Sequence, residues 1–356
     1  MQSAHAQILT TRNQPSPDEC PTPRQLADAS PLSATAELHV RETRGRLRRR
    51  LQDGHGPLIV VVGPCSIHSE EAAEAYAERL EPVVRRLEDD LIIVLRAYFE
   101  KPRTTVGWKG FLYDPDLDGT NRLAEGLRRA RAIASSLAER RLALATELLD
   151  PLASEFFEDQ LSWAAIGART AESQIHRQLA SRVGYPVGIK NGTDGSVDVA
   201  AAAMLSAGAP HTHLGVDRNG RLGVLQSSGN PHTHVVLRGG KSGPNYDAAS
   251  VGRIGEALVR QGLAPRVLVD ASHGNSEKDH RRQARVVDAV VEQLPRSDVD
   301  VLGVMLESHL REGRQEASPE ARPDCSVTDA CIDFETTEAL LERLAVASRA
   351  RTTRPG

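Results

Sequence analysis

The sequence predicts an α/β fold, a (β/α)8 TIM barrel with an N-terminal extension and an inserted β-hairpin. After Gly56, short apolar runs alternate with amphipathic helical stretches, as parallel strands joined by crossover helices do. Eight such runs remain when one hairpin is set aside, and eight parallel strands suit a closed barrel. A doubly wound open sheet is the alternative, but the segment Gly63-Pro64-Cys65-Ser66 after the first strand lacks the glycine-rich dinucleotide loop of that fold.

The first 56 residues are expected to lie outside the barrel. Residues 1–22 carry Ser, Pro, Gln and Thr without apolar periodicity, which predicts a flexible tail. Residues 23–56 form an extension, and the pattern is helical from Thr22 to Asp53. We interpret its basic stretch from Arg41 to Arg50 as a solvated helix face rather than a nucleic-acid surface, because no recognition motif accompanies it.

The barrel is expected to span residues 57–351. Its strands are predicted at Leu58 to Gly63, Leu91 to Arg96, Ala143 to Glu147, Ala164 to Ala168, Val187 to Lys190, His234 to Arg238, Arg266 to Asp270 and Val301 to Leu306. A further pair of short runs flanks Asn219-Gly220, the strongest short signal for a tight hairpin. We therefore predict a hairpin insertion at about residues 212–226.

Composition narrows the class of protein. With 356 residues, one barrel with one extension is expected. The net charge of −4 and a pI near 6.3 give no general attraction to nucleic acid or to an anionic membrane, so small-molecule partners are expected. No apolar run approaches the roughly 20 residues of a membrane span, and no secretory signal is recognised, so a cytoplasmic protein is expected. Four scattered cysteines are too few for a disulfide framework.

Charged or reactive side chains stand at or just past the end of every predicted strand. They are Cys65, Arg96, Glu147, Arg169, Lys190, Arg238, His273 and Glu307. In a barrel these ends converge on the C-terminal face, where active sites of this fold lie. A lone arginine would be interpreted as an ion-pair partner, but four cations around one mouth require an anion such as phosphate or carboxylate. Polyanionic substrates are therefore predicted.

A metal site is predicted at the same face. Cys65, His273, Glu307 and Asp329 offer a thiolate, an imidazole and two carboxylates, which suit one divalent ion such as Mn, Fe, Co or Zn. Their linear spacing is no motif, so this prediction depends on the barrel. Glu147 has two interpretations of equal weight, as a proton carrier or as the ion-pair partner of a lysine or arginine. Three loops that begin at Lys101, Lys190 and Arg238 combine cations with glycine or hydroxyl groups, as phosphate-binding loops do.

Several literal segments carry a resemblance to one family. They are Gly63 to His68, Tyr98 to Gly110, Trp163, Ala165 to Thr170, Lys190 to Gly195, Leu237 to Gly240 and Glu307 to Leu310. They resemble the class I synthases of 3-deoxy-D-arabino-heptulosonate 7-phosphate (DAHP) of the feedback-regulated microbial type, over about Thr22 to Arg351. The resemblance implies a transferase that condenses phosphoenolpyruvate with erythrose 4-phosphate and water, the first step of the shikimate pathway.

The resemblance also implies roles for individual residues. It puts the metal ligands at Cys65, His273, Glu307 and Asp329. It implies phosphoenolpyruvate contacts at Arg96, Glu147, Ala168, Arg169, Lys190 and Arg238, and erythrose 4-phosphate contacts at Lys101, Pro102, Arg103, Thr104 and Asp329. Lys101, Glu147, Asp329 and His273 are the residues expected to act in catalysis. One departure is that Asp324 and Cys325 precede Ser326, where the family usually has Gly-Lys or Gly-Gln in a loop about two residues longer.

Regulation and assembly are implied by the resemblance alone. The N-terminal extension, two helices and the hairpin would bind an aromatic amino acid as inhibitor, near Pro151, Leu179, Val183 and Gly184, with tyrosine favoured because Gly184 leaves room for a hydroxyl group. A homodimer or homotetramer assembled through the extension is implied. The competing hypotheses are a related synthase that uses arabinose 5-phosphate and a non-catalytic amino-acid sensor. The Lys101-Pro102-Arg103-Thr104 loop argues against the first, and the complete set of ligands argues against the second.

Overall fold

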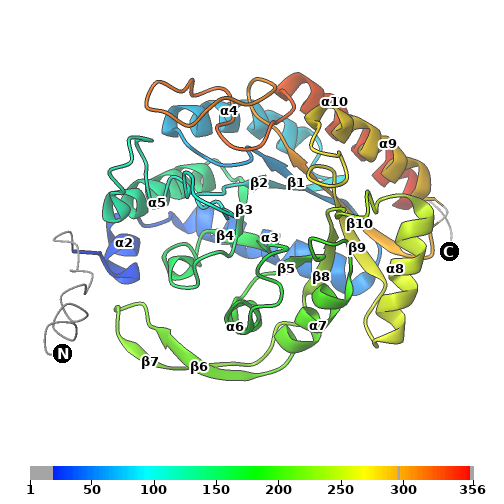
Figure 1. Cartoon of the computed structure of the whole chain (residues 1–356), viewed down its shortest axis with the longest axis horizontal. Coiled ribbons are helices and arrows are strands. Elements are labelled where there is room, and N and C mark those ends of the chain that lie inside the picture. Colours follow the sequence, from blue (N-terminus) through cyan, green and yellow to red (C-terminus); the bar gives the residue numbers. More distant parts are fainter. Residues whose placement is uncertain (1–18, 296, 353–356) are drawn as a thin grey trace, which may run out of the picture.

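The computed structural model describes residues 19–295 and 297–352, and the predicted tail lies mostly outside these residues. Eight parallel strands close into a barrel in the order β1-β10-β9-β8-β5-β4-β3-β2 (Figure 1). A separate two-stranded antiparallel sheet, β6 with β7, is inserted between α7 and β8. The predicted barrel class, with its extension and its hairpin, is therefore confirmed.

The barrel strands are β1 (Leu58–Gly63), β2 (Leu91–Arg96), β3 (Ala143–Glu147), β4 (Leu161–Ile166), β5 (Val187–Lys190), β8 (Thr233–Leu237), β9 (Arg266–Asp270) and β10 (Asp300–Glu307). The helices are α2 (Pro23–Ala29), α3 (Ala34–Asp53), α4 (Glu70–Arg86), α5 (Leu123–Glu139), α6 (Gln174–Arg182), α7 (Asp198–Ala207), α8 (Ala248–Arg260), α9 (Gln283–Gln293) and α10 (Phe334–Thr352). Short 3-10 helices η1 (Ala153–Phe156) and η2 (His280–Arg282) precede β4 and α9.

Two predicted boundaries were wrong. The predicted helical stretch from Thr22 to Asp53 is two helices, because Pro31 interrupts the chain and Ser33 starts α3 by accepting a hydrogen bond from the Ala36 amide. Strand β4 begins at Leu161 instead of Ala164 and ends at Ile166. Its pairing with β3 shifts register between Leu144 and Ala145, and this irregularity obscures the strand's start in the sequence.

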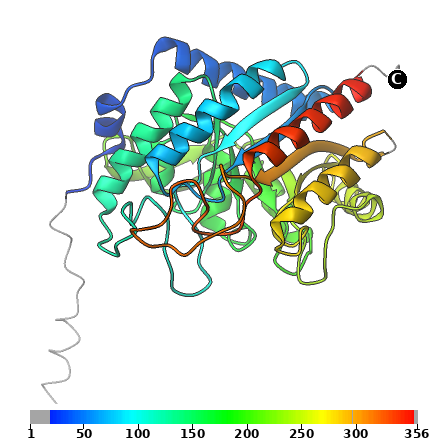
Figure 2. The ribbon, with the colours of Figure 1, turned by 90° about the horizontal axis from the view of Figure 1, so that it is seen from above.

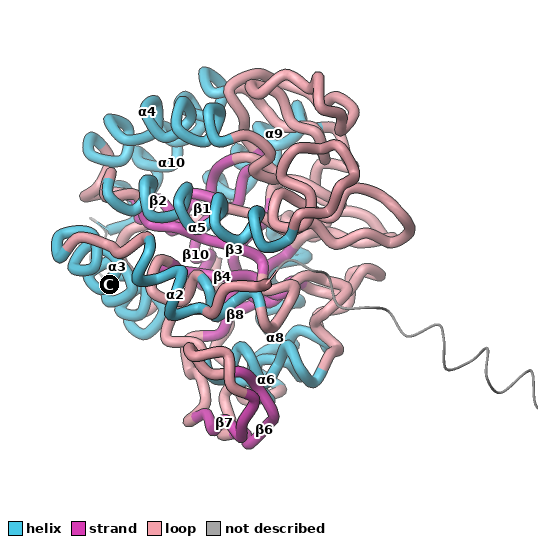
Figure 3. The backbone as a smooth tube through the Cα atoms, turned by 90° about the vertical axis from the view of Figure 1, so that its left-hand side faces the viewer, coloured by secondary structure: helices cyan, strands magenta, loops and turns pink. Residues whose placement is uncertain are grey.

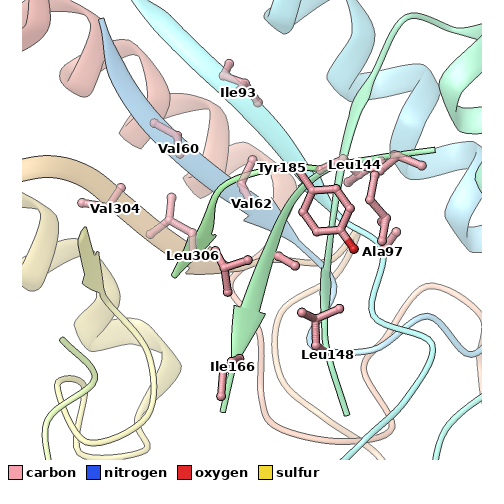
Figure 4. Packing of buried hydrophobic residues seen from close by; sticks show 14 of the residues in the cluster. Val60, Val62, Ile93, Ala97, Leu144, Leu148, Ile166, Tyr185, Val304 and Leu306 are labelled. Carbon is pink, nitrogen blue, oxygen red and sulfur yellow. The ribbon is translucent and has the colours of Figure 1, made fainter. Parts of the chain in front are cut away.

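Apolar side chains pack on both faces of the barrel sheet, outside and inside the barrel. One layer fills the space between the strands and the outer helices, and Val60, Val62, Ile93 and Leu306 belong to it (Figure 4). The other fills the lumen of the barrel and includes Trp163. A β-carbon at position 188, where β5 has glycine, would lie 2.4 Å from the Trp163 ring. Gly188 therefore leaves the space that the indole occupies.

Helix α3 closes the N-terminal end of the barrel. Its residues Leu47 and Leu51 are buried in the same apolar cluster as the lumen residues. In Figure 2, α3 (blue) lies at the end of the barrel opposite to the loops that follow β10 (brown). The plug leaves the C-terminal end as the open face.

The basic stretch of α3 is not a solvated face, which corrects the prediction. Arg44 donates to the carbonyl oxygens of Leu161 and Glu158, and Arg46 donates to that of Glu88. Arg48 donates to the carbonyl oxygen of Gly184. These arginines hydrogen-bond to main-chain carbonyl groups at the closed end, so they attach α3 to the barrel.

Asp300, the first residue of β10, is bound by arginines of α3 and α10. Arg50 of α3 binds its two carboxylate oxygens at 2.9 and 2.8 Å, and Arg351 of α10 lies 2.5 Å from Oδ1. The Nε of Arg266 is 3.8 Å from Oδ2. Burial alone would raise the pKa of Asp300, but its bonds with Arg50 and Arg351 lower it.

The hairpin extends away from the barrel (Figure 3). In it β6 (His211–Val216) pairs with β7 (Leu222–Ser227), and Leu214 lies opposite Val224. Leu214, Leu222 and Val224 are exposed, so one face of this small sheet is apolar and uncovered by the described residues. Among the residues described, no helix is both long and apolar enough to cross a membrane.

We predict that Asp300→Asn lowers the free energy of unfolding by about 3 to 5 kcal/mol, because the buried Arg50 loses its charged partner. Urea denaturation measures this change. The matched control is Asp288→Asn, which removes an aspartate from an exposed pair with Arg343 and should change stability by less than about 1 kcal/mol. Equal effects of the two substitutions would contradict the role of Asp300.

Candidate active site

A cavity of about 260 Å³ opens at the C-terminal end of the barrel. Its lining includes all ten predicted substrate-binding residues, namely Arg96, Lys101, Pro102, Arg103, Thr104, Glu147, Ala168, Arg169, Lys190 and Arg238. His273, Glu307 and Asp329 of the predicted metal set also line it, and Cys65 lies buried beside it. The structure therefore brings together residues that span more than 260 positions of the sequence.

The electrostatic character of the cavity is positive. Six cationic side chains line it against three carboxylates. Arg96 and Lys190 are buried, whereas Arg169 is exposed at the rim. Cations that lie this close together repel one another unless anions neutralise them. The cavity is thus suited to a ligand with several negative charges.

Three of the four predicted metal ligands form a compact group. The ligand atoms of Cys65, Glu307 and Asp329 all lie within 4.8 Å of one another. His273 stands at the edge of this group, with its Nε2 3.8 Å from Oε1 of Glu307. Sulfur and oxygen donors at this spacing, with an imidazole adjacent, fit a borderline divalent metal ion.

Lys101 contacts the thiol of Cys65. Its Nζ lies 3.1 Å from Sγ of Cys65 and 3.0 Å from the carbonyl oxygen of that residue. Burial, followed by the charge of Glu307, raises the pKa of the Cys65 thiol to about 11, although Lys101 opposes this shift. The thiol therefore keeps its proton at neutral pH unless a further positive charge is bound nearby.

Glu307 connects the metal group to the cationic group. Its Oε1 lies 3.1 Å from the guanidinium of Arg96, and both side chains are 0% exposed. Its Oε2 accepts a hydrogen bond from Ser272. Burial alone would raise the pKa of Glu307, but His273 and Arg96 lower it to about 2. The carboxylate is therefore ionised at neutral pH.

The loop after β2 is held at its base and exposed at its tip. The amide of Lys101 donates to the carbonyl oxygen of Lys109, and Nε of Arg103 donates to that of Trp108. A β-carbon at Gly110 would lie 2.3 Å from the carbonyl oxygen of Phe99, so only glycine fits this close approach. At the tip, Val106 is 96% exposed. The loop thus forms one rim of the cavity.

Glu147 is buried at the end of β3 and lines the cavity. A β-carbon at Gly167 would lie 2.3 Å from its Oε1, so the carboxylate occupies the space that this glycine leaves. No ion pair to Glu147 occurs within residues 19–295 and 297–352. The role of Glu147 as a proton carrier stays a prediction.

The unusual loop before Asp329 is held by ion pairs. Asp324 bridges Arg311 and Arg322 at 3.3 and 3.0 Å. Cys325 is buried, with Sγ 3.8 Å from the carbonyl oxygen of Glu312. The two residues that depart from the usual family pattern therefore have structural partners in this loop.

The predicted inhibitor-site residues lie around α6, apart from the cavity. Leu179 and Val183 are buried, Pro151 is partly buried and Gly184 is exposed. Next to them, the Ser181 hydroxyl lies 2.6 Å from that of Ser227, which connects α6 to the hairpin. The helix that carries Leu179 therefore lies next to the hairpin.

Two residues of the site were missed by the sequence analysis. Tyr98 is buried in the cavity wall, and the guanidinium of Arg96 lies 4.0 Å from the centre of its ring. Asp270 is buried beside His273 and Lys190. Asp270 is the last residue of β9. The search for charged residues at strand ends could have found it, but His273 was chosen for this strand.

A pair of carboxyl groups lies beneath the rim loop. The Tyr113 hydroxyl is 3.3 Å from Oε1 of Glu100 and 3.1 Å from Oδ2 of Asp150. Burial, followed by the charge of Asp150, raises the pKa of Glu100 to about 8. Glu100 precedes Lys101, so this pair lies directly against the base of the loop.

Comparisons with known proteins agree with this geometry. The sequence model of the DAHP synthetase I family matches residues 37–342. The chain is 45% identical over 326 residues to the Tyr-sensitive phospho-2-dehydro-3-deoxyheptonate aldolase of Escherichia coli (91% of each chain) and 45% identical over 329 residues to the tyrosine-inhibited enzyme of Schizosaccharomyces pombe (90% of this chain and 88% of that enzyme). A solved structure of the aldolase from Francisella tularensis superposes with a TM-score of 0.92 at 41% identity, covering 95% of this chain and 99% of that one.

We predict that Glu100→Gln stabilises the protein increasingly as the pH rises from about 5 to 8. The native state keeps a proton on Glu100 up to about pH 8, whereas the unfolded chain releases it near the ordinary pKa of 4.5. The wild type therefore loses up to about 1.4 kcal/mol of stability per pH unit in this window, and glutamine, which mimics the protonated form, does not. Urea denaturation at several pH values, with the exposed Glu338→Gln variant as control, measures the difference. A difference between wild type and Glu100→Gln that stays constant over this window would disprove the assignment.

Proposed function

The chain belongs to the DAHP synthetase I family, and we propose that its barrel mouth condenses phosphoenolpyruvate with erythrose 4-phosphate and water to give DAHP and phosphate. The observation that carries this proposal is one cavity in which six cations meet a thiol, an imidazole and carboxylates. Both substrates are anionic, and one carries an aldehyde. The cations of the cavity can bind the negative charges of both substrates, and its metal ligands can hold an ion near the aldehyde.

The cations around β4, β5 and β8 hold phosphoenolpyruvate. Arg169, Lys190 and Arg238 bind its phosphate and carboxylate, and the buried Arg96 contributes charge from below. Ala168 lies between Gly167 and Arg169 in the cavity wall, where its backbone approaches the ligand. Fixing both ends of the molecule keeps C3 directed at the second substrate, which is an orientation effect.

The rim loop holds erythrose 4-phosphate. Arg103 and Thr104 bind its phosphate, while Pro102 shapes the loop. Lys101 reaches from this loop to the metal group and touches both substrates, so its ammonium group stabilises negative charge as the new C–C bond forms.

A divalent metal ion would be held by Cys65, His273, Glu307 and Asp329. When bound, it would supply Lewis-acid polarisation of the aldehyde oxygen. Asp329 lies at the exposed side of this group, so it also contacts the four-carbon sugar. His273 would act in catalysis by holding the ion, and Asp329 can accept or donate a proton at the product hydroxyl group. Mn, Fe, Co and Zn all suit the donor set.

Glu147 carries the proton of the attacking water. Its carboxylate lies in the cavity wall beside Gly167 and Ala168, on the phosphoenolpyruvate side. One carboxylate oxygen accepts a proton as water adds at C2 of phosphoenolpyruvate. Phosphate then leaves by C–O cleavage, and the cations of the mouth stabilise its charge.

We predict consumption of phosphoenolpyruvate with erythrose 4-phosphate and manganese, and none with arabinose 5-phosphate or with chelator.

Lys101→Met should lower kcat on the order of 100-fold, because it removes a cation at the reacting centre. Lys109→Met is the matched control, since Lys109 is exposed on the same loop outside the cavity lining. The loss of ultraviolet absorbance measures the rate. Absence of turnover with either sugar after metal repletion would overturn the proposal in favour of a sensor.

One relative is named tyrosine-inhibited, and others are named Tyr-sensitive or Phe-sensitive. We propose that an aromatic amino acid also inhibits this enzyme, and that it binds in the region of α6 and the hairpin. Pro151, Leu179, Val183 and Gly184 lie there. The apolar hairpin face and the N-terminal extension of residues 23–56 supply the contact surface of a homodimer or homotetramer. Tyrosine is the favoured inhibitor, because a β-carbon at Gly184 would have only Arg44 within 4 Å.

We predict that tyrosine lowers the initial rate more strongly than phenylalanine or tryptophan at equal concentration. Gly184→Leu should abolish the inhibition, because its side chain fills the free space, and each variant is compared with its own uninhibited rate. Initial rates measured over a range of concentrations of each amino acid test both expectations. Inhibition by tyrosine that persists unchanged in Gly184→Leu would place the inhibitor elsewhere.

A further inference from the structure

The carboxylate of Asp270 lies between the two halves of the active site. Asp270 ends β9 and is completely buried. Its Oδ1 accepts the amide of Ser272, and its main-chain carbonyl accepts the side-chain amide of Asn275. These two bonds hold the local backbone. They leave Oδ2 free to serve another purpose.

Oδ2 of Asp270 contacts one residue from each half. It lies 2.9 Å from Nδ1 of His273 and 3.5 Å from Nζ of Lys190. Neither Oδ2 nor Nδ1 has an aligned hydrogen bond among the described residues, although both are buried. One carboxylate oxygen is therefore shared between a proposed metal ligand and a proposed phosphoenolpyruvate ligand.

The backbone of His273 is strained in a way that fixes this contact. Its φ angle is 55°, in the left-handed region that residues with a β-carbon adopt at a cost on the order of 1 to 3 kcal/mol. The amide of Gly274 donates to the carbonyl oxygen of Arg238, and that of Lys278 donates to His273. These bonds hold the strained turn, which keeps the imidazole against Asp270 with Nε2 toward Glu307.

We propose that Asp270 is a positioning residue that couples metal binding to phosphoenolpyruvate binding. This inference rests on the proposed function of the mouth. A carboxylate on Nδ1 orients a ligating imidazole and increases its basicity. Lys190 competes for the same oxygen. When an anion engages Lys190, Asp270 interacts more strongly with His273, so each ligand favours the binding of the other.

The substitution Asp270→Asn isolates this role. Asparagine keeps an oxygen for the Ser272 amide, but it replaces Oδ2 with an amide nitrogen that cannot accept from His273 or Lys190. The control for loss of an aspartate is Asp247→Asn. Asp247 caps α8 and does not line the cavity, and asparagine is an equally good cap.

The experiment is a titration with Mn²⁺ alone, followed by electron paramagnetic resonance of the free ion, so that no turnover is needed. Asp270→Asn should bind Mn²⁺ about 10 to 100 times more weakly than the wild type, and Asp247→Asn should match the wild type. Lys190→Met should bind Mn²⁺ more tightly, because Oδ2 of Asp270 then interacts with His273 alone. In the Asp270→Asn background, Lys190→Met should have no effect.

The last comparison separates coupling through Asp270 from direct repulsion between Lys190 and the ion, because direct repulsion would persist in the double variant. Arg238→Met serves as a second control, since it removes a cation from the mouth that has no contact with Asp270 among the described residues. Should Asp270→Asn fail to fold, a greater gain in affinity for Lys190→Met than for Arg238→Met supports the proposal, and equal gains overturn it.

The outcomes also distinguish the two proposals. A wild type that binds no Mn²⁺ contradicts the proposed function itself. A wild type that binds one ion per chain, with Asp270→Asn within twofold of it, leaves the function intact and overturns the role of Asp270.

Discussion

The buried pair of Arg96 and Glu307 is the contact on which the arrangement of the mouth depends. Two charges without exposure to solvent are costly, and their approach to 3.1 Å, with Ser272 and His273 beside the carboxylate, offsets that cost. Arg96 ends β2 and Glu307 ends β10, and β1, which leads to Cys65, lies between these strands. The pair therefore fixes the anion-binding half of the mouth against the metal-binding half.

The rest of the fold supplies a rigid frame for this pair. Strands β1 to β5 and β8 to β10 form a closed ring, so the position of each strand end is set by two neighbours. Helix α3 fills the opposite opening with Leu47 and Leu51, and Asp300 ties that helix to α10. Function is thereby confined to one end of the barrel, while the ion pairs and the plug at the other end serve stability.

The strand ends were predictable because short, mostly apolar runs that end in a charged residue are visible in the sequence. Arg96, Glu147 and Lys190 occur as the final residue of their strands, as expected. Contacts between distant segments were not predictable. The arginines of α3 look solvated in sequence because their partners are main-chain carbonyl groups more than 40 residues away. Asp270 was missed because its importance comes from Lys190 and His273, which only the barrel brings to it.

We propose that the mouth of the barrel holds a metal ion and a polyanion side by side. The direct measurement is a crystal structure with Mn²⁺ and phosphoenolpyruvate, using the anomalous signal of manganese. We expect one anomalous peak about 2.0 to 2.4 Å from the ligand atoms of Cys65, His273, Glu307 and Asp329, with phosphoenolpyruvate against Arg169, Lys190 and Arg238. A manganese peak away from these ligands, or phosphoenolpyruvate bound outside the mouth, would contradict it.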